Sequence, residues 1–220
     1  MNIAQVQVAI FYDVNSPIDF DGLSYFIRRD VKNIIGLELQ NMQLFGVLPT
    51  DAPPEIPRLQ LNSANNKLRV VSSLQRFDLF FERLDTDNEV KLDVFYTLLD
   101  KIFNIHESLN AKIIRVGLIA LKTEVDDTPN ITIANTNLNA KGVGDFSGLS
   151  DVHLMFNRRF VLEGLDFNCH LTLMPGTDLL RGRSLLVKQI DVSSFENVIF
   201  YQKYNPDLIK KAFCEKIAEY

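Results

Sequence analysis

The sequence predicts an α+β protein in which an antiparallel, strongly curved sheet carries about three helices on one face. Segments with alternating apolar residues, which are typical of strands with one buried side, recur along the chain. Three longer segments follow helical spacing and keep their charges on one side. Short polar turns separate several neighbouring strand segments, which favours antiparallel pairing.

The chain begins with a strand and a helix. Residues 3–12 alternate, and the apolar members of one face are Val6, Val8, Ile10 and Tyr12. Ser16 and Pro17 then supply an N-cap and a proline for the first helical turn, and Asp19 adds an early carboxylate. The sequence therefore predicts a helix that ends at Gly36.

The next segments predict a meander. Residues 37–48 are expected to form a strand, and the prolines of residues 51–57 an extended connection. A hairpin follows, in which Asn65-Asn66 form the turn between strands near residues 59–61 and 68–70. Residues 76–83 continue the meander.

A covering helix and a central strand come next. The apolar spacing over residues 90–109 predicts an amphipathic helix. Residues 112–122 are apolar on both sides except at Arg115, which predicts a strand in the middle of the sheet.

The remaining chain predicts a loop, a hairpin and a terminal helix. Residues 126–149 are rich in Asp, Asn, Thr and Gly, with room for one short strand near residues 131–134. Two strands at residues 151–162 and 165–174 are joined by Glu163-Gly164, which pairs Leu162 with Leu165 and Arg158 with Cys169. A further strand at residues 184–192 and a helix at residues 205–219 complete the chain.

The predicted elements fit one compact domain over residues 1–220, with half-domains at 1–125 and 126–220 as an alternative. Strands 57–84 followed by helix 90–109 resemble strands 151–192 followed by helix 205–219. This order predicts a duplicated unit of a β-meander and a helix, although no repeat of individual residues supports it.

Composition excludes several classes of protein. The net charge of −5 argues against binding that tracks a nucleic-acid backbone over the whole surface, although a local basic patch is compatible with it. The two cysteines lack a CxxC spacing, which fits a reducing cytoplasm, with one bridge between them as the alternative. We expect no signal peptide and no membrane span.

Known catalytic and phosphate-binding patterns are not matched. The glycine-containing segment 141–148 lacks a GK[ST] triplet, so we interpret it as a loop. The turn places His153 opposite Met174, about 13 Å along the strand from His170, too far to share one metal ion. Cys169 and His170 are adjacent in a strand and point to opposite faces, so Cys169 is expected to be a core residue. We predict no catalytic residues, no metal site and no cofactor.

Two arginines interrupt apolar strands. Strict alternation places Arg158 on the apolar face of its hairpin, where an unpaired charge is costly. A β-bulge, an ion pair or an anionic ligand could explain it, and the bulge or ion pair is favoured. Arg115 poses the same question.

The other candidate residues are polar or basic. The opposite face of the hairpin carries Arg159 and His170 among other polar residues, which fits either a ligand surface or a solvated sheet. Arg181 and Arg183 form a basic cluster with Lys188, and exposed loop charge is the favoured interpretation. The candidate ligand-binding residues are thus Arg115, Arg158, Arg159, His170, Arg181 and Arg183.

Part of the chain resembles a known family. The segments are Pro57-Arg58-Leu59, Arg76-Phe77, the helix at 90–109 and Ile114-Arg115-Val116-Gly117-Leu118. They resemble a sporadically distributed prokaryotic family of uncharacterised proteins over the first half to two thirds of the chain. In that family the last segment continues into Arg, an aromatic residue and Asn, whereas residues 119–122 here are Ile-Ala-Leu-Lys. The patchy distribution implies carriage with mobile elements or defence islands.

Three functions follow as hypotheses. The first is a non-catalytic interaction or accessory protein, in a bacterial or phage conflict system, that binds a protein partner or itself as a homo-oligomer. The second is a sensor for a small anionic ligand or nucleotide. The third is an enzyme with an unfamiliar site around His153, Arg159, Asp166 and His170. Generic nucleic-acid binding is not expected.

Overall fold

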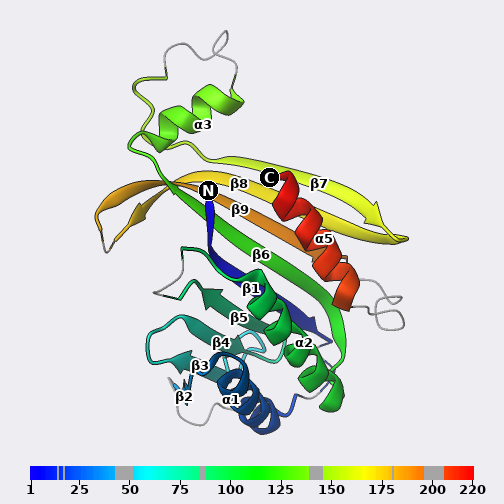
Figure 1. Ribbon diagram of the computed structural model, residues 1–220. Helices are drawn as coiled ribbons and strands as arrows, with labels where there is room; N and C mark the ends of the chain where they lie inside the picture. Colours follow the sequence, from blue (N-terminus) through cyan, green and yellow to red (C-terminus); the bar gives the residue numbers. More distant parts are fainter. Residues whose placement is uncertain are drawn as a thin grey trace.

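The computed structural model describes residues 1–13, 15–16, 18–42, 52–84, 88–138, 146–179, 181–195 and 206–220. One antiparallel sheet of nine strands in the order β2-β3-β4-β5-β1-β6-β9-β8-β7 dominates the molecule (Figure 1). The strands are β1 (Asn2–Tyr12), β2 (Leu39–Asn41), β3 (Leu59–Ser63), β4 (Leu68–Ser72), β5 (Arg76–Glu82), β6 (Ile113–Val125), β7 (Leu154–Leu162), β8 (Leu165–Asp178) and β9 (Arg183–Ser194). The described helices are α1 (Phe20–Ile35), α2 (Leu92–Ser108), α3 (Pro129–Asn137) and α5 (Pro206–Glu219). The α+β class and the antiparallel sheet are confirmed.

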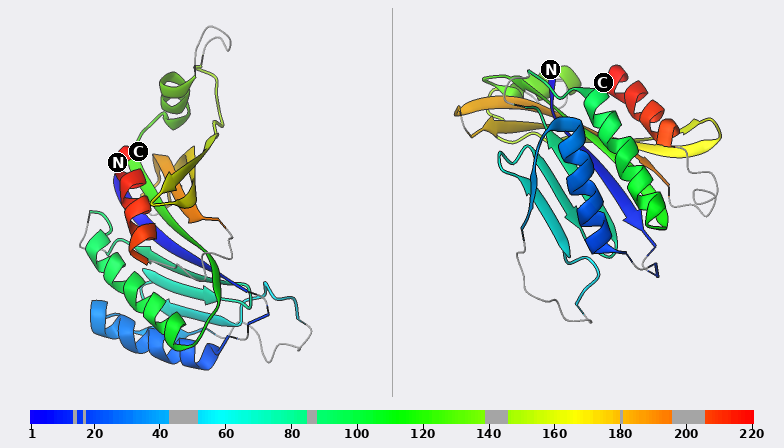
Figure 2. Two further views of the ribbon diagram at one scale, coloured as in Figure 1. Left: turned by 90° about the vertical axis from the view of Figure 1, so that its right-hand side faces the viewer. Right: turned by 60° about the horizontal axis from the view of Figure 1, so that its bottom comes forward.

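Helices α1, α2 and α5 lie on one side of the sheet (Figure 2). They bury the inward side chains of the strands in one large core that includes Ile10, Leu23, Phe95 and Phe213. Helix α3 packs instead against the far ends of β8 and β9, where Ile133 joins Val152 and Leu173 in a second, smaller core. The described residues therefore form four helices, and the expectation of about three was too low.

Strands β1 and β6 join the two parts of the sheet. Val8 in β1 lies opposite Leu79 in β5 and opposite Leu118 in β6, and all three side chains are fully buried. Strand β6 pairs on its other side with β9. The central position predicted for residues 112–122 is confirmed, and one sheet runs through both predicted half-domains. The duplication of a meander and helix unit stays a prediction.

The segment predicted to hold a short strand near residues 131–134 is helical, so that prediction was wrong. Alternating Ile131, Thr132 and Ile133 favour a strand by local propensity. Pro129 occupies the first turn of α3, and Ile133 and Ala134 are both buried. Adjacent residues are about 100° apart around a helix, so both can lie within its buried side, whereas in a strand they point to opposite faces. Packing of both residues against β8 and β9 therefore favours the helix.

The predicted helix after β1 is confirmed, but its first residue is later than expected. The N-cap is Asp19, whose carboxylate accepts a hydrogen bond from the Gly22 amide at 2.9 Å. Ser16 is therefore not the cap, and Pro17 lies outside the described residues. Gly36 ends the helix with a φ of 70°, a left-handed conformation that favours glycine.

Within the described residues, the strand predicted over residues 37–48 is shorter than expected. Strand β2 covers only three residues, and residues 43–51 lie outside the described part of the chain. Within the proline-containing connection, the Ile56 amide donates to the Pro53 carbonyl at 3.1 Å, which makes a turn rather than a fully extended segment.

Both predicted hairpins are confirmed. Asn66 has a φ of 55° in the turn between β3 and β4, and Leu61 lies opposite Val70. Glu163 and Gly164 have φ values of 51° and 81°, which is the geometry of a two-residue hairpin turn. Two-residue turns fix the register of their strands.

No helix in the described ranges is long and apolar enough to cross a membrane.

Candidate functional site

The sheet face opposite the helices carries a group of polar side chains from the four strands β5, β6, β8 and β9. Since side chains alternate along a strand, the residues between the buried positions point to this face. We call these residues the polar cluster: Arg76, Asp78, Arg115, Asn168, His170, Asp191 and Ser193.

Asp191 is the centre of the polar cluster. It lies opposite His170 in β8, and burial raises the pKa of its carboxyl group, whereas His170, Arg115 and Arg76 lower that pKa. Three cationic or titratable side chains from three strands therefore act on one carboxylate. A Cβ atom added at Gly117 would lie 3.7 Å from its Oδ1 atom, in ordinary contact, so the glycine leaves space beside the carboxylate.

Two arginines of the polar cluster contact one aromatic ring. The guanidinium carbons of Arg76 and Arg115 lie 4.9 and 5.1 Å from the centre of the Phe11 ring. Arg76 is held by Asp78 at 2.7 Å. Arg115 donates from Nη2 to Ser193 Oγ at 3.1 Å, while its buried Nε has no hydrogen-bond partner in the described structure. A buried donor without a partner is costly and is a place where water or a ligand atom can bind.

Asn168 and His170 form a second polar pair. The amide nitrogen of Asn168 lies 2.5 Å from His170 Nε2. When the amide donates, this imidazole nitrogen accepts and carries no proton. The Asn168 Oδ1 atom is buried and has no partner in the described structure. Two unsatisfied polar atoms therefore occur in the same cluster.

The structure brings together only some of the predicted residues. Arg115 and His170 belong to the polar cluster. Arg159 points to the same face from β7, with its guanidinium 4.9 Å from the centre of the Phe195 ring. Arg181 lies in the turn between β8 and β9, and Arg183 begins β9, about 26 Å along that strand from Asp191.

Arg158 points to the helix face, as strict alternation predicted. Its Nη1 atom lies 2.9 Å from Glu219 Oε1, and its side chain is 62% exposed. The favoured ion pair is therefore present, at the surface rather than in the core, and β7 and β8 pair without a register shift at this residue.

Sequence reasoning missed Arg76, Asp78, Asp191 and Ser193. Asp191 stands between the buried residues Ile190 and Val192, and a charge between apolar neighbours is the signal that drew attention to Arg115. The two interruptions come from strands that are neighbours only in the folded protein.

The residues considered for catalysis do not converge. His153 lies 2.9 Å from Asp151, His106 is buried on the inner side of α2, and His170 bonds to Asn168. The described residues contain no group of three or more His, Cys, Asp or Glu side chains that could hold a metal ion.

Cys169 is buried, as predicted, and burial raises the pKa of its thiol. Both cysteines are free, so the alternative of a disulfide is wrong. The glycine-containing segment lies mostly outside the described residues.

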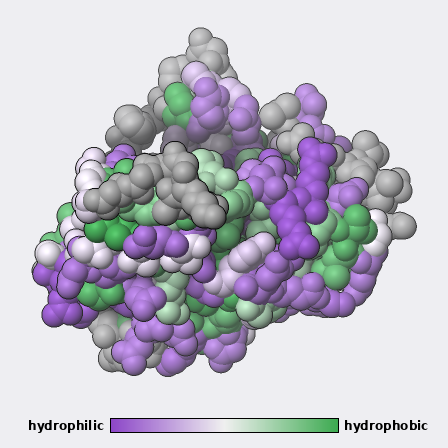
Figure 3. All heavy atoms as spheres, turned by 90° about the horizontal axis from the view of Figure 1, so that it is seen from above, coloured by the Kyte–Doolittle hydropathy of each residue, from purple (hydrophilic) through white to green (hydrophobic). Residues whose placement is uncertain are grey.

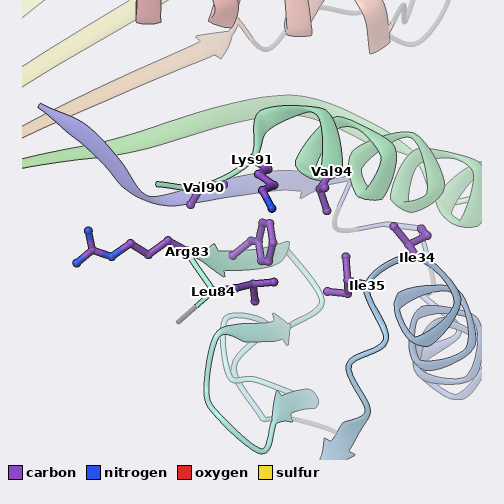
Figure 4. A pocket seen from close by; sticks show the side chains of 8 residues that line it. Ile34, Ile35, Arg83, Leu84, Val90, Lys91 and Val94 are labelled. Atoms are coloured by element: carbon purple, nitrogen blue, oxygen red, sulfur yellow. The ribbon is translucent and has the colours of Figure 1, made fainter. Parts of the chain in front are cut away.

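An apolar cavity of about 150 Å³ opens between the end of α1, the end of β5 and the start of α2 (Figure 4). Its lining residues are Ile34, Ile35, Phe81, Arg83, Leu84, Val90, Lys91 and Val94. The Lys91 side chain points toward the space, whereas the Arg83 side chain points away from it. The cavity has room for a small apolar group, but its lining residues do not indicate which group it would bind.

Strand β7 forms an outer edge of the sheet over nine residues. Its side chains are unusually apolar for an exposed strand: Met155 is 75% exposed, Val161 66% and Phe156 49%. Hydrophobic surface is visible at the side of the molecule that carries the tip of the β7–β8 hairpin (Figure 3). The opposite edge, β2, has only three residues. A long, apolar edge strand can pair with a strand of another chain.

No family model matches the chain, and no curated protein matches it.

Proposed function

We propose that this protein is a non-catalytic interaction protein that binds a protein partner along the edge of β7. The exposed edge is the observation that carries the proposal. The outer side of β7 offers backbone donors and acceptors, and Met155, Phe156 and Val161 offer apolar contacts beside them. Pairing with a partner strand satisfies both kinds of group at once.

The two edges of the sheet support the choice of β7. Soluble proteins protect their edges with short strands, charges or covering segments. Strand β2 is short, whereas β7 is three times as long and carries exposed apolar side chains on both faces. Among the described residues, β7 is therefore the edge that gains most from a partner.

The double variant Met155→Lys/Val161→Lys is expected to abolish any complex formed through this edge, because two ammonium groups would have to be buried in the new seam. Native mass spectrometry of protein gently purified from its host, combined with amide hydrogen exchange of β7, measures this. The matched control is Val125→Lys/Leu179→Lys, which adds the same charge at two exposed apolar residues outside β7.

Support requires three results together: a complex in the wild type, protection of β7 amides in it, and its loss only in the β7 variant. A strictly monomeric wild type whose outward β7 amides exchange freely would contradict the proposal.

A sensor for a small anionic ligand is the second candidate, and the polar cluster favours it. The buried Nε of Arg115 and the two guanidinium groups around Phe11 supply donors for an anion.

Inorganic phosphate, added up to millimolar concentration, is expected to raise the melting temperature of the wild type but not of Arg115→Gln. Arg181→Gln, an exposed arginine outside the cluster, serves as the control. Equal responses in the wild type and Arg115→Gln would exclude this site.

An accessory role in a bacterial or phage conflict system is part of the first proposal and rests on the family resemblance alone. The enzyme hypothesis stays last, because His153, His170 and Asp166 occupy separate positions along the β7–β8 hairpin.

A further inference from the structure

We infer that the partner of β7 is a second copy of this chain, paired antiparallel about a two-fold axis at Arg158. This inference rests on the proposed function, because it uses the same edge. It specifies the occupant, the register and the contacts across the seam.

The order of side chains in β7 is self-complementary. In an antiparallel pair centred on Arg158, each residue meets the one at the mirrored distance from the centre. Leu154 then meets Leu162 of the second copy, Met155 meets Val161, and Phe156 meets Phe160. Every apolar residue of the strand faces another apolar residue, and Asn157 meets Arg159. Cross-strand pairs of this kind stabilise a sheet.

The charges at the seam fit the same register. Beyond the strand, the mirrored count brings Glu163 near His153 of the second copy. Glu163 is paired with Lys211 of its own chain, and His153 lies 2.9 Å from its own Asp151, so neither end brings an unpaired charge to the seam. At the centre the two Arg158 residues come together, but each already lies 2.9 Å from its own Glu219 carboxylate. The central guanidinium groups are therefore neutralised before they meet.

Both faces of the sheet gain from this pairing. Phe156 and Phe160 point to the helix face, where Lys216 of α5 lies over the Phe160 ring at 4.6 Å. Met155 and Val161 point to the other face, where no described helix covers them. A second copy would cover exposed apolar area on each face, which favours association.

The register can be tested by disulfide trapping. In the background Cys214→Ser, which removes the exposed cysteine, the pair Met155→Cys/Val161→Cys places two thiols opposite each other across the seam. Paired residues have Cα atoms about 4.5 to 5.5 Å apart, within the range of a disulfide. The same two residues within one chain are about 20 Å apart along the strand, so only an interchain bond can form.

Mild oxidation at micromolar protein concentration is expected to convert most of the double variant into a covalent dimer. The control Met155→Cys/Arg159→Cys, whose residues face each other only in a register centred on Asn157, should crosslink at least fivefold more slowly. Sedimentation equilibrium of the wild type should give twice the chain mass of 25.1 kDa.

A monomeric wild type, or equal crosslinking of both cysteine pairs, would overturn the inference. If the purified chain is monomeric but a complex from the host still depends on β7, the second copy is wrong and the proposed function stands. If no β7-dependent complex exists in either case, both fail.

Discussion

Replacing Phe213 by alanine is expected to lower the free energy of unfolding by about 3 to 5 kcal/mol, which is typical for a large side chain removed from a core. Phe213 is fully buried, and its helix α5 covers β6 and β9. The end of α5 is also tied to the sheet, because Lys122 donates to the Ile217 carbonyl at 2.7 Å and Lys188 to the Tyr220 carbonyl at 2.8 Å. A loosened helix would leave these ammonium groups without acceptors.

Urea denaturation followed by circular dichroism measures the loss. Glu215→Ala is the matched control, since Glu215 is exposed on the same helix, and it should change stability by no more than about 0.5 kcal/mol. A loss below about 1 kcal/mol for Phe213→Ala would mean that α5 contributes little to the core.

The second large effect concerns His106, which is buried and neutral. Its Nδ1 atom lies 2.7 Å from the Ile102 carbonyl, which can only accept, so Nδ1 carries the proton. Its Nε2 atom then accepts from the Tyr12 hydroxyl at 2.6 Å. Burial lowers the pKa of His106 to about 4, although the hydrogen bond to the Ile102 carbonyl acts in the other direction and raises that pKa.

Acidification is therefore expected to destabilise the protein through His106. In the unfolded chain the imidazole binds its proton near pH 6.5, whereas the folded state resists protonation down to about pH 4. The contribution of His106 to the free energy of unfolding is fully present above pH 6.5 and is lost progressively as the pH falls to 4. The loss amounts to roughly 3 kcal/mol.

Comparison of the wild type with His106→Gln isolates this residue, because glutamine can donate and accept but does not titrate. Free energies of unfolding measured between pH 7 and 4 should fall more steeply in the wild type, by roughly 3 kcal/mol. The other two histidines are present in both proteins. Parallel curves would show that His106 does not control the acid response.

Elements with strong local patterns were predicted correctly. The register of the β7–β8 hairpin followed from the Glu163-Gly164 turn, because a two-residue turn leaves one way to count the pairs. Helix α2 and strand β6 followed from periodicity, since their apolar residues repeat over many positions. Helix α3 was missed because its local propensity and its packing disagree.

The candidate site was harder to predict than the fold. The partner of Arg158, Glu219, lies 61 residues further along the chain, and no local pattern connects the two. Asp191 and Arg115 become neighbours only because β6 pairs with β9, while the two hairpins give no information on that pairing. The order of strands in a sheet depends on long-range contacts that a single sequence does not display.

The pairing of β1 with β6 also sets an order of events during synthesis. Val8 meets Leu118, which is made 110 residues later. At bacterial and eukaryotic rates of translation this takes roughly 5 to 20 s. Until β6 is made, β5 is the only native neighbour with which β1 can pair, and the other edge of β1 stays open. A ribosome that stalls before residue 113 therefore displays an 11-residue strand with no native neighbour on one side, which is the kind of surface that chaperones protect.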